Sequence, residues 1–181
     1  MTPPHDPQTA PSGARRALAV LGTAVFLILA PGFFVMLVPY WISRWRFQPP
    51  LLGLAPLRAL GVLLMAAALP VLLESFARFA LQGRGTPAPV FPTQHLVVTG
   101  FYRYVRNPMY VAVVSMVLGQ GFLFGNLRVL AYGLVAWLVT HLFVLTYEEP
   151  TLHKSFGTEY ETYRANVPRW IPRVTPWRSG S

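Results

Sequence analysis

Four long apolar runs constrain the fold of this 181-residue chain more than any other feature of its sequence. The runs carry few or no charged residues and cover residues 17–38, 59–80, 109–127 and 129–147. A helix needs about 20 apolar residues to cross the hydrocarbon core of a bilayer. One such run also fits a buried core helix, but four leave too little other sequence to cover them from water. We therefore expect an all-α, polytopic membrane protein with about four transmembrane helices.

The composition agrees with this fold class. Charged residues make up 12% of the chain and hydrophobic residues 54%, whereas an average soluble domain carries about 25% charged residues. A disordered chain is excluded because it needs low hydrophobicity. The chain has no cysteine, which excludes disulfides, thiolate nucleophiles and zinc sites with cysteine ligands. We expect one domain over residues 15–181, after a disordered tail at 1–14 that is rich in proline, threonine and serine.

The basic residues predict the orientation of the helices, because cytoplasmic loops are enriched in arginine and lysine. A cytoplasmic N-terminus places only four of them outside, at Arg44, Arg46, Arg58 and Arg128. The other 11 then lie inside, namely Arg15, Arg16, Arg78, Arg84, Arg103, Arg106, Lys154, Arg164, Arg169, Arg173 and Arg178. We therefore expect both termini in the cytoplasm, in a bacterial-type inner membrane. Topology and attraction to anionic membrane lipids explain the net charge of +9, so no nucleic-acid partner is expected.

Two long segments share the cytoplasmic face in this topology. One is the proline-rich loop at residues 81–107, and the other is the tail from Glu148, which we expect to contain a helical segment. Loops of this length in compact domains are usually functional or disordered, and polar residues on a shared face can meet. The third and fourth helices are joined by little more than Gly125-Asn126, which predicts a tight antiparallel hairpin.

Two adjacent carboxylates, Glu148 and Glu149, follow the fourth apolar run. Negative charges at a helix C-terminus are unfavourable because the helix dipole is negative there. The pair therefore predicts a cationic partner, either Arg103, Arg106 or a bound ligand, with a solvated pair at the membrane interface as the simpler alternative. His141 lies about two turns earlier. No second histidine or cysteine lies at ligand spacing, so we expect a helix–helix hydrogen bond there and no metal site.

A longer pattern connects these residues. In order, the chain contains the motif Gly100-x-Tyr-Arg-Tyr-Val-Arg-Asn-Pro-Met-Tyr110, an apolar hairpin and the pair Glu148-Glu149. This pattern resembles the integral-membrane methyltransferases of the isoprenylcysteine carboxyl methyltransferase and phosphatidylethanolamine N-methyltransferase group. The resemblance covers about residues 60–172, and the segments 156–160 and 167–172 are similar to the tail of the isoprenylcysteine branch.

One departure from that group concerns the substrate. The isoprenylcysteine branch usually has Arg-His-Pro where this chain has Arg106-Asn107-Pro108, and the Asn-Pro-Met-Tyr and Glu-Glu-Pro forms look more like the phospholipid branch. The mixture leaves both acceptor classes open. Asn107 can hydrogen-bond but cannot titrate near neutral pH, so an acid–base role is excluded. Asn107 fits the cap of the third helix and Pro108 its first position.

The resemblance implies S-adenosylmethionine as methyl donor, bound by the part of the chain at about residues 81–172. Burying this donor requires a partner for each of its charges. The resemblance and the donor's chemistry together indicate contacts with His95, Leu96, Val97, Gly100, Tyr102, Arg103, Tyr104, Arg106, Asn107, Pro108, Tyr110, Glu148 and Glu149. In this hypothesis backbone groups at 95–97 contact the adenine, an arginine holds the carboxylate, and the glutamates accept from the ammonium or the ribose. The tyrosines also fit simple interfacial anchors.

The implied reaction is a direct methyl transfer to a lipid or other hydrophobic acceptor, either a phospholipid amine or a prenylcysteine-like carboxylate. Positioning and desolvation supply most of the rate of such a transfer. Glu148 or Glu149 is the available base for an ammonium acceptor, and Arg106 completes the expected catalytic group. Arg169 is a candidate for aligning a carboxylate acceptor.

Charged and small residues within the apolar runs have separate interpretations. Glu74 and Arg78 lie four apart, which fits a structural pair on one helix face. Charges inside a membrane helix are nevertheless functional candidates, so Glu74 is a further candidate substrate contact. Small residues permit close helix packing in membranes, and we assign this role to Gly119, Gly121 and Gly125.

Two other functions stay open at this point. A sterol-type membrane reductase that uses a nicotinamide cofactor has a similar C-terminal part, but such chains are usually much longer. A non-enzymatic membrane scaffold or binding subunit explains the helices and the basic loops. It gives no reason for paired glutamates opposite a loop rich in arginine and tyrosine.

Overall fold

The computed structural model describes residues 21–22, 25, 29, 31–78 and 96–178. Over these residues the secondary structure is helical and contains no strand, which confirms the all-α part of the expected fold class. The expected disordered tail at 1–14 and His95 lie outside the described residues, as does most of the loop between the second and third apolar runs.

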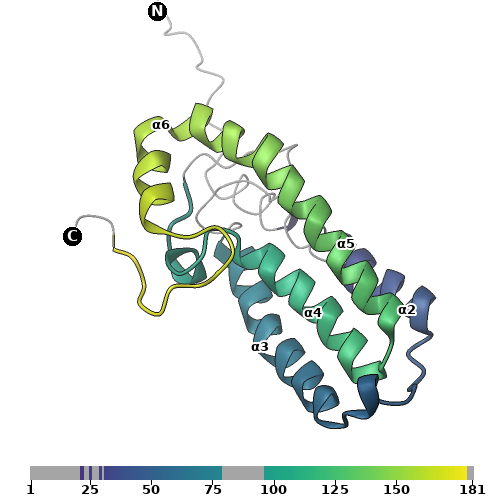
Figure 1. Ribbon diagram of the computed structural model, residues 1–181. Coiled ribbons are helices and arrows are strands. Elements are labelled where there is room, and N and C mark those ends of the chain that lie inside the picture. The colour runs from purple at the N-terminus through teal and green to yellow at the C-terminus, as the bar shows by residue number, and fades with distance from the viewer. Residues whose placement is uncertain (1–20, 23–24, 26–28, 30, 79–95, 179–181) are drawn as a thin grey trace, which may run out of the picture.

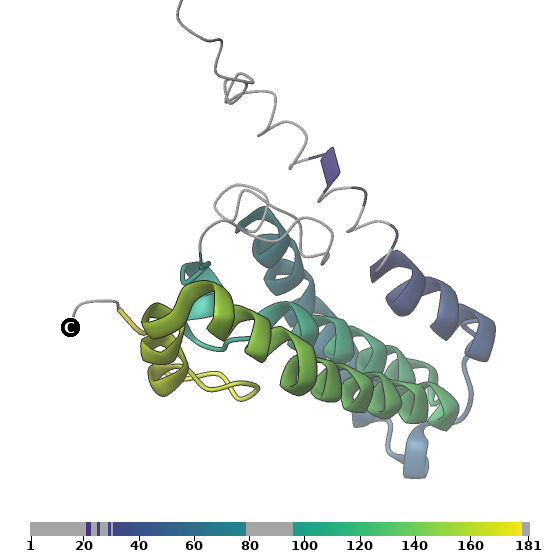
Figure 2. The same cartoon turned by 90° about the horizontal axis from the view of Figure 1, so that it is seen from above.

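Three helices lie side by side and form the body of the molecule (Figures 1 and 2). They are α3 (Pro56–Arg78), α4 (Pro108–Phe124) and α5 (Leu127–Phe143). A short helical unit, η1 (Gly32–Leu37) with α2 (Val38–Ser43), contacts α4 and α5. Beyond α5 the chain stays helical through η5 (Val144–Glu148) into α6 (Glu149–Asn166), and single turns occur at η2 (Leu51–Gly53) and η4 (Gly100–Arg103).

The packing of α3 against α4 depends on two glycines. A Cβ atom at Gly61 would lie 2.5 Å from the carbonyl oxygen of Gly119, and a Cβ at Gly119 would lie 2.7 Å from that of Gly61. The helix backbones therefore touch at this point, as we expected for Gly119. Nearer the other ends of these helices, a buried apolar cluster joins them through Ala68, Leu72, Phe76, Met109 and Ala112.

The hairpin between α4 and α5 is confirmed. Gly125 ends α4 with a φ of +67°, in the left-handed region that glycine adopts without strain. The Asn126 side chain then caps α5 by accepting hydrogen bonds from the backbone N–H groups of Arg128 at 3.0 Å and Val129 at 3.2 Å.

Side chains of α4 and α5 attach the first described helix to the bundle by hydrogen bonds to its backbone carbonyls. Pro39 has no N–H, so the carbonyl of Val35 four residues earlier lacks its usual helical donor. The Gln120 side chain donates to that oxygen at 2.7 Å, and the Tyr132 hydroxyl donates to the carbonyl of Phe34 at 3.0 Å. The Trp45 indole N–H donates in turn to Gln120 at 3.2 Å. Neighbouring helices therefore satisfy polar groups that water would otherwise bind.

Two helices have the length and composition of a membrane span, Pro56–Arg78 and Leu127–Asn166. The segments Gly32–Ser43 and Pro108–Phe124 are apolar helices of shorter length. The second long helix is bent. Gly157, within α6, has φ +50° and ψ −122°, and the chain turns back beyond it.

The last described segment, residues 167–177, runs back along the loop that precedes α4, and we call it the strap (Figure 1). Three backbone hydrogen bonds of 2.9 Å hold it, from Arg106 N–H to the Pro168 carbonyl, from Arg173 N–H to Tyr104 and from Trp177 N–H to Arg103. The loop, the start of α6 and the strap thereby meet at one end of the bundle.

Candidate functional site

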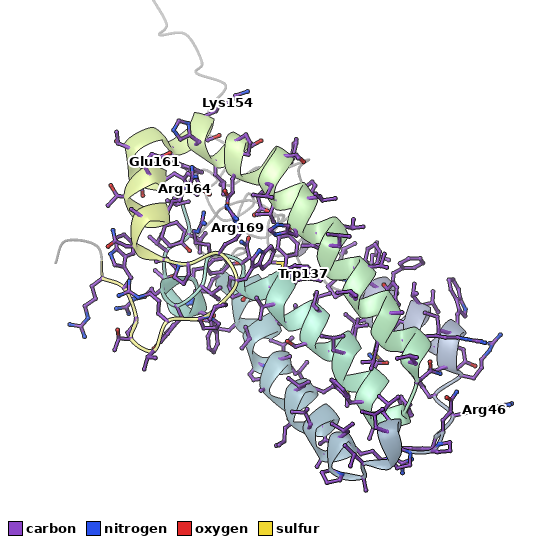
Figure 3. All side chains as sticks on the ribbon, in the orientation of Figure 1. Arg46, Trp137, Lys154, Glu161, Arg164 and Arg169 are labelled. Atoms are coloured by element: carbon purple, nitrogen blue, oxygen red, sulfur yellow. The ribbon has the colours of Figure 1, made fainter. Side chains whose placement is uncertain are left out.

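Glu149 is the centre of this meeting point. Its Oε1 lies 2.9 Å from Arg106 Nη1 and 2.6 Å from Arg169 Nε, and its Oε2 lies 2.9 Å from Arg169 Nη2. The side chains of Glu149 and Arg106 are 11% and 9% exposed. The predicted cationic partner is therefore present for Glu149, and two arginines share that role. The expected helix end at this pair is wrong, because the helix continues through η5 into α6. Figure 3 labels Arg169 on the strap, beneath the helix that carries Glu149.

Arg169 binds Glu149 through two parallel N–H groups, which is the strong bidentate geometry of arginine and carboxylate. The hydrogen bond with Glu149 raises the pKa of the Arg169 guanidinium above its ordinary value. The strap is thus fixed to the start of α6 by an ion pair that stays charged at physiological pH. We expected Arg169 to align a substrate, and the structure places its side chain on Glu149.

Arg106 has a second set of contacts. Its Nη1 donates to the Tyr160 hydroxyl at 3.0 Å, while its Nε is buried with no hydrogen-bond partner among the described residues. A buried donor without a partner is costly, so Nε is suited to bind a ligand. The residue is one of those that line a small cavity of about 20 Å³, namely Arg106, Asn107, Val144, Glu148, Glu149, Leu152, Tyr160 and Tyr163.

Glu148 lines the same cavity but has different surroundings from its neighbour. The Tyr110 hydroxyl donates to its Oε2 at 3.0 Å. Among the described residues no arginine, lysine or histidine forms an ion pair with Glu148, whereas two arginines bind Glu149. Two carboxylates in contrasting environments can take different roles in one site.

The loop before α4 is held mainly by the strap and α6. Arg103 Nε donates to the Trp177 carbonyl at 2.7 Å, and the Tyr163 hydroxyl donates to the Tyr102 carbonyl at 2.7 Å. Burial raises the pKa of Tyr102 well above its ordinary value, so its phenol stays neutral. Arg103 therefore contacts the strap and not the glutamates, so it is not the cationic partner that we considered beside Arg106.

Asn107 and Pro108 open α4 as expected, with Pro108 in the first turn. The side chain of Asn107, however, makes no cap hydrogen bond to the helix. Its Nδ2 instead donates to the carbonyl of Arg169 at 3.2 Å. The amide that replaces the histidine of the isoprenylcysteine branch therefore adds to the attachment of the strap.

The structural pair expected on the second apolar run is present. Arg78 Nε donates to Glu74 Oε1, and the other carboxylate oxygen accepts from the backbone N–H of Phe101 at 3.4 Å. Gly100 has a φ of +56°, and a Cβ there would overlap the Glu74 and Arg78 side chains. Glu74 thus anchors the start of η4. A substrate contact for Glu74 stays a prediction.

The chain is similar to known proteins in both sequence and fold. Residues 57–159 match the model of a family described as phospholipid methyltransferase, which covers more than half of the chain. The chain belongs to the phospholipid methyltransferase family. Membership confirms the resemblance drawn from the motif between Gly100 and Tyr110 and from the paired glutamates.

Two relatives extend this finding. The protein-S-isoprenylcysteine O-methyltransferase of Schizosaccharomyces pombe is 43% identical over 82 residues, which are 44% of this chain and 34% of that protein. The solved eukaryotic intramembrane Ras methyltransferase ICMT shares the fold with a TM-score of 0.54 at 16% identity, over 94% of this chain and 56% of that one. The chain thus spans about half the length of the solved relative. These likenesses and the two long apolar helices support an integral membrane protein.

Several residues of this candidate site were not predicted from the sequence. Tyr160 and Tyr163 lie three apart on one face of α6, where a helical period could have indicated a shared role. Trp170 donates its indole N–H to His141 Nδ1 at 2.9 Å, so His141 bonds the strap and not another helix. Of the residues expected at the adenine, Val97 is buried and Leu96 packs against the tyrosines of α6.

Proposed function

We propose that this protein transfers a methyl group from S-adenosylmethionine to a lipid or other hydrophobic acceptor at the cytoplasmic membrane face. The observation that carries the proposal is the buried Arg106–Glu149 pair beside Glu148, in a chain of the phospholipid methyltransferase family. Family membership favours this function over a nicotinamide-dependent reductase or a scaffold.

The residues around the cavity fit one end of the methyl donor. The buried Nε of Arg106 can donate to the donor's carboxylate, and Glu148 can accept from its ammonium or ribose hydroxyls. A ligand of this size needs a pocket of about 300 Å³ or more, so the cavity of about 20 Å³ holds only a single group of it. When bound, the donor supplies an electrophilic methyl group on its sulfonium.

The two glutamates have different roles in this proposal. Glu149 orders Arg106 and Arg169 and thereby shapes the site. Glu148 accepts a hydrogen bond from the Tyr110 hydroxyl and forms no ion pair with a described residue. It is the base for an ammonium acceptor. A carboxylate acceptor needs no base, so the requirement for Glu148 differs between the two acceptor classes. Positioning and exclusion of water supply the rest of the rate.

The finer topology belongs to the same proposal. In it the two long candidate helices are spans. The apolar runs at 17–38 and 109–127, whose described helical parts include Gly32–Ser43 and Pro108–Phe124, supply two more crossings. The excess of basic residues near the site supports a cytoplasmic location for that end of the bundle and for both termini, in a bacterial-type inner membrane. The donor-binding part extends over about residues 81–172 of a single domain.

A labelling experiment tests the function. The purified protein is incubated with methyl-labelled S-adenosylmethionine and a bacterial lipid extract or a prenylcysteine, and the product is identified by mass. We expect a labelled lipid or a labelled methyl ester. Glu148→Gln should lower the rate of transfer to an amine by a larger factor than the rate of transfer to a carboxylate. Folded protein that labels neither acceptor class would contradict the proposal.

A further inference from the structure

The tip of the strap, residues 170–174, lies beside a membrane-spanning helix. The Trp170 indole donates to His141 Nδ1 at 2.9 Å, and its ring contacts Trp137 edge-on at a centroid distance of 6.5 Å. In Figure 3 the strap reaches toward the labelled Trp137 on α5. His141 precedes Glu148 by seven residues, or roughly 10 Å along the helix at 1.5 Å per residue. The tip therefore returns to a deeper level than the Arg106–Glu149 pair.

Two side chains of the tip have almost no protein cover. Ile171 is 79% exposed and Val174 is 98% exposed. The neighbouring surface of α5 is also apolar, with Leu138 and Leu142 about half exposed. The Trp170–His141 hydrogen bond holds the tip at the level of His141 on α5. At that level the exposed side chains of Ile171 and Val174 extend the lipid-facing surface of α5.

The backbone of the strap limits how deep the tip can lie and favours the membrane interface. Irregular backbone near hydrocarbon is tolerated only when its polar groups are satisfied. Prolines at positions 168, 172 and 176 have no N–H to satisfy. Arg173 and Trp177 donate their N–H groups to Tyr104 and Arg103. The N–H groups of Trp170, Ile171 and Val174 have no protein acceptor among the described residues, so they need interfacial water or lipid headgroups.

The charged residues of the strap complete the pattern. Arg169 points inward onto Glu149, while Arg173 follows the exposed Ile171 and donates one guanidinium N–H to the Asn166 carbonyl. Arginine beside exposed aliphatic residues is typical of segments that lie in the interface and bind anionic headgroups.

We propose that the tip of the strap inserts into the membrane interface, with Ile171 and Val174 among the acyl chains and Arg173 at the headgroups of anionic phospholipids. Insertion holds the strap against α5 and so keeps Arg169 on Glu149. The proposal goes beyond methyl transfer and does not depend on the identity of the acceptor.

Single-cysteine labelling tests this contact, because the chain has no native cysteine. Val174→Cys and, separately, Ile171→Cys carry a nitroxide label in nanodiscs that contain phosphatidylglycerol and phosphatidylcholine. The control is Glu159→Cys, on an exposed position of α6. Collisions with a water-soluble nickel complex should be about threefold or more rarer at both strap positions than at 159, and collisions with oxygen more frequent. Equal nickel access at 174, 171 and 159 would overturn the proposal.

A second arm tests the lipid charge. Nanodiscs of phosphatidylcholine alone should raise nickel access at Val174→Cys, and Arg173→Gln should raise it in the anionic nanodiscs by a similar factor. No change in either sample would contradict the headgroup contact. These readouts need no donor and no turnover, so loss of methyl transfer and loss of membrane contact are separately visible.

Discussion

Residues that are adjacent in sequence differ in role at this site. Glu149 is bound by two arginines, one from the loop before α4 and one from the strap, and Glu148 by a phenol. The repulsion between neighbouring carboxylates predicted a cationic partner, and Arg106 was one of the two arginines considered. Arg169 could not be chosen for that position from the sequence, because its approach depends on the path of the strap.

Glu149→Gln tests the importance of this ion-pair cluster. The substitution keeps the shape of the side chain but leaves Arg106, with a side chain only 9% exposed, without its countercharge. Removing one partner of a buried pair costs about 3 kcal/mol, so we expect a fall of that size in the free energy of unfolding, measured by SDS titration.

The matched control for this variant is Glu161→Gln. Glu161 pairs with His153 and Arg164, and its side chain is 49% exposed. Exposed pairs contribute about 1 kcal/mol or less. Equal losses for the two variants would contradict the central position given to Glu149.

The helices were largely predictable, and the connections between them only in part. Length and apolarity predicted α3, α4 and α5, and Gly125 with Asn126 predicted the hairpin. The bend at Gly157 and the return of the strap were not predicted. They depend on tertiary hydrogen bonds to residues 103–106, and hydrophobic periodicity contains no information about such bonds.

The contact between α3 and α4 gives a prediction at this scale. Gly119→Ala places a methyl group 2.7 Å from the Gly61 carbonyl oxygen, so the helices must separate. Overpacking of this kind costs about 1–3 kcal/mol, and we expect a lower thermal midpoint in detergent. Gly32→Ala is the control, since a Cβ there meets no atom within 4 Å. A midpoint for Gly119→Ala at or above that of Gly32→Ala would contradict the close contact.

Over the whole molecule, the two ends of the bundle differ. Lys154, Arg164 and Arg169 lie at the end that carries the site, and Arg46 lies at the opposite end (Figure 3). The distribution of basic residues predicted this polarity from the sequence. The full surroundings of the candidate site were less predictable, because contacts such as that of Asn107 with Arg169 join segments 62 residues apart.

The orientation has a direct test in cells. Arg46→Cys should react with a membrane-impermeant maleimide in intact spheroplasts, and Lys154→Cys should react only after the membrane is opened. Both residues are exposed, so access depends on the side of the membrane and not on burial. The reverse labelling pattern would place the site outside.

Donor binding tests the central claim most directly. Calorimetry of S-adenosylmethionine with the purified, folded protein should show binding that Glu148→Gln and Arg106→Lys each weaken about tenfold or more, since hydrogen bonds to charged groups contribute about 1.5–3 kcal/mol. The control is Glu159→Gln, an exposed carboxylate on α6, which should bind like the wild type. No binding by the folded wild type, or wild-type affinity in both site variants, would contradict this account.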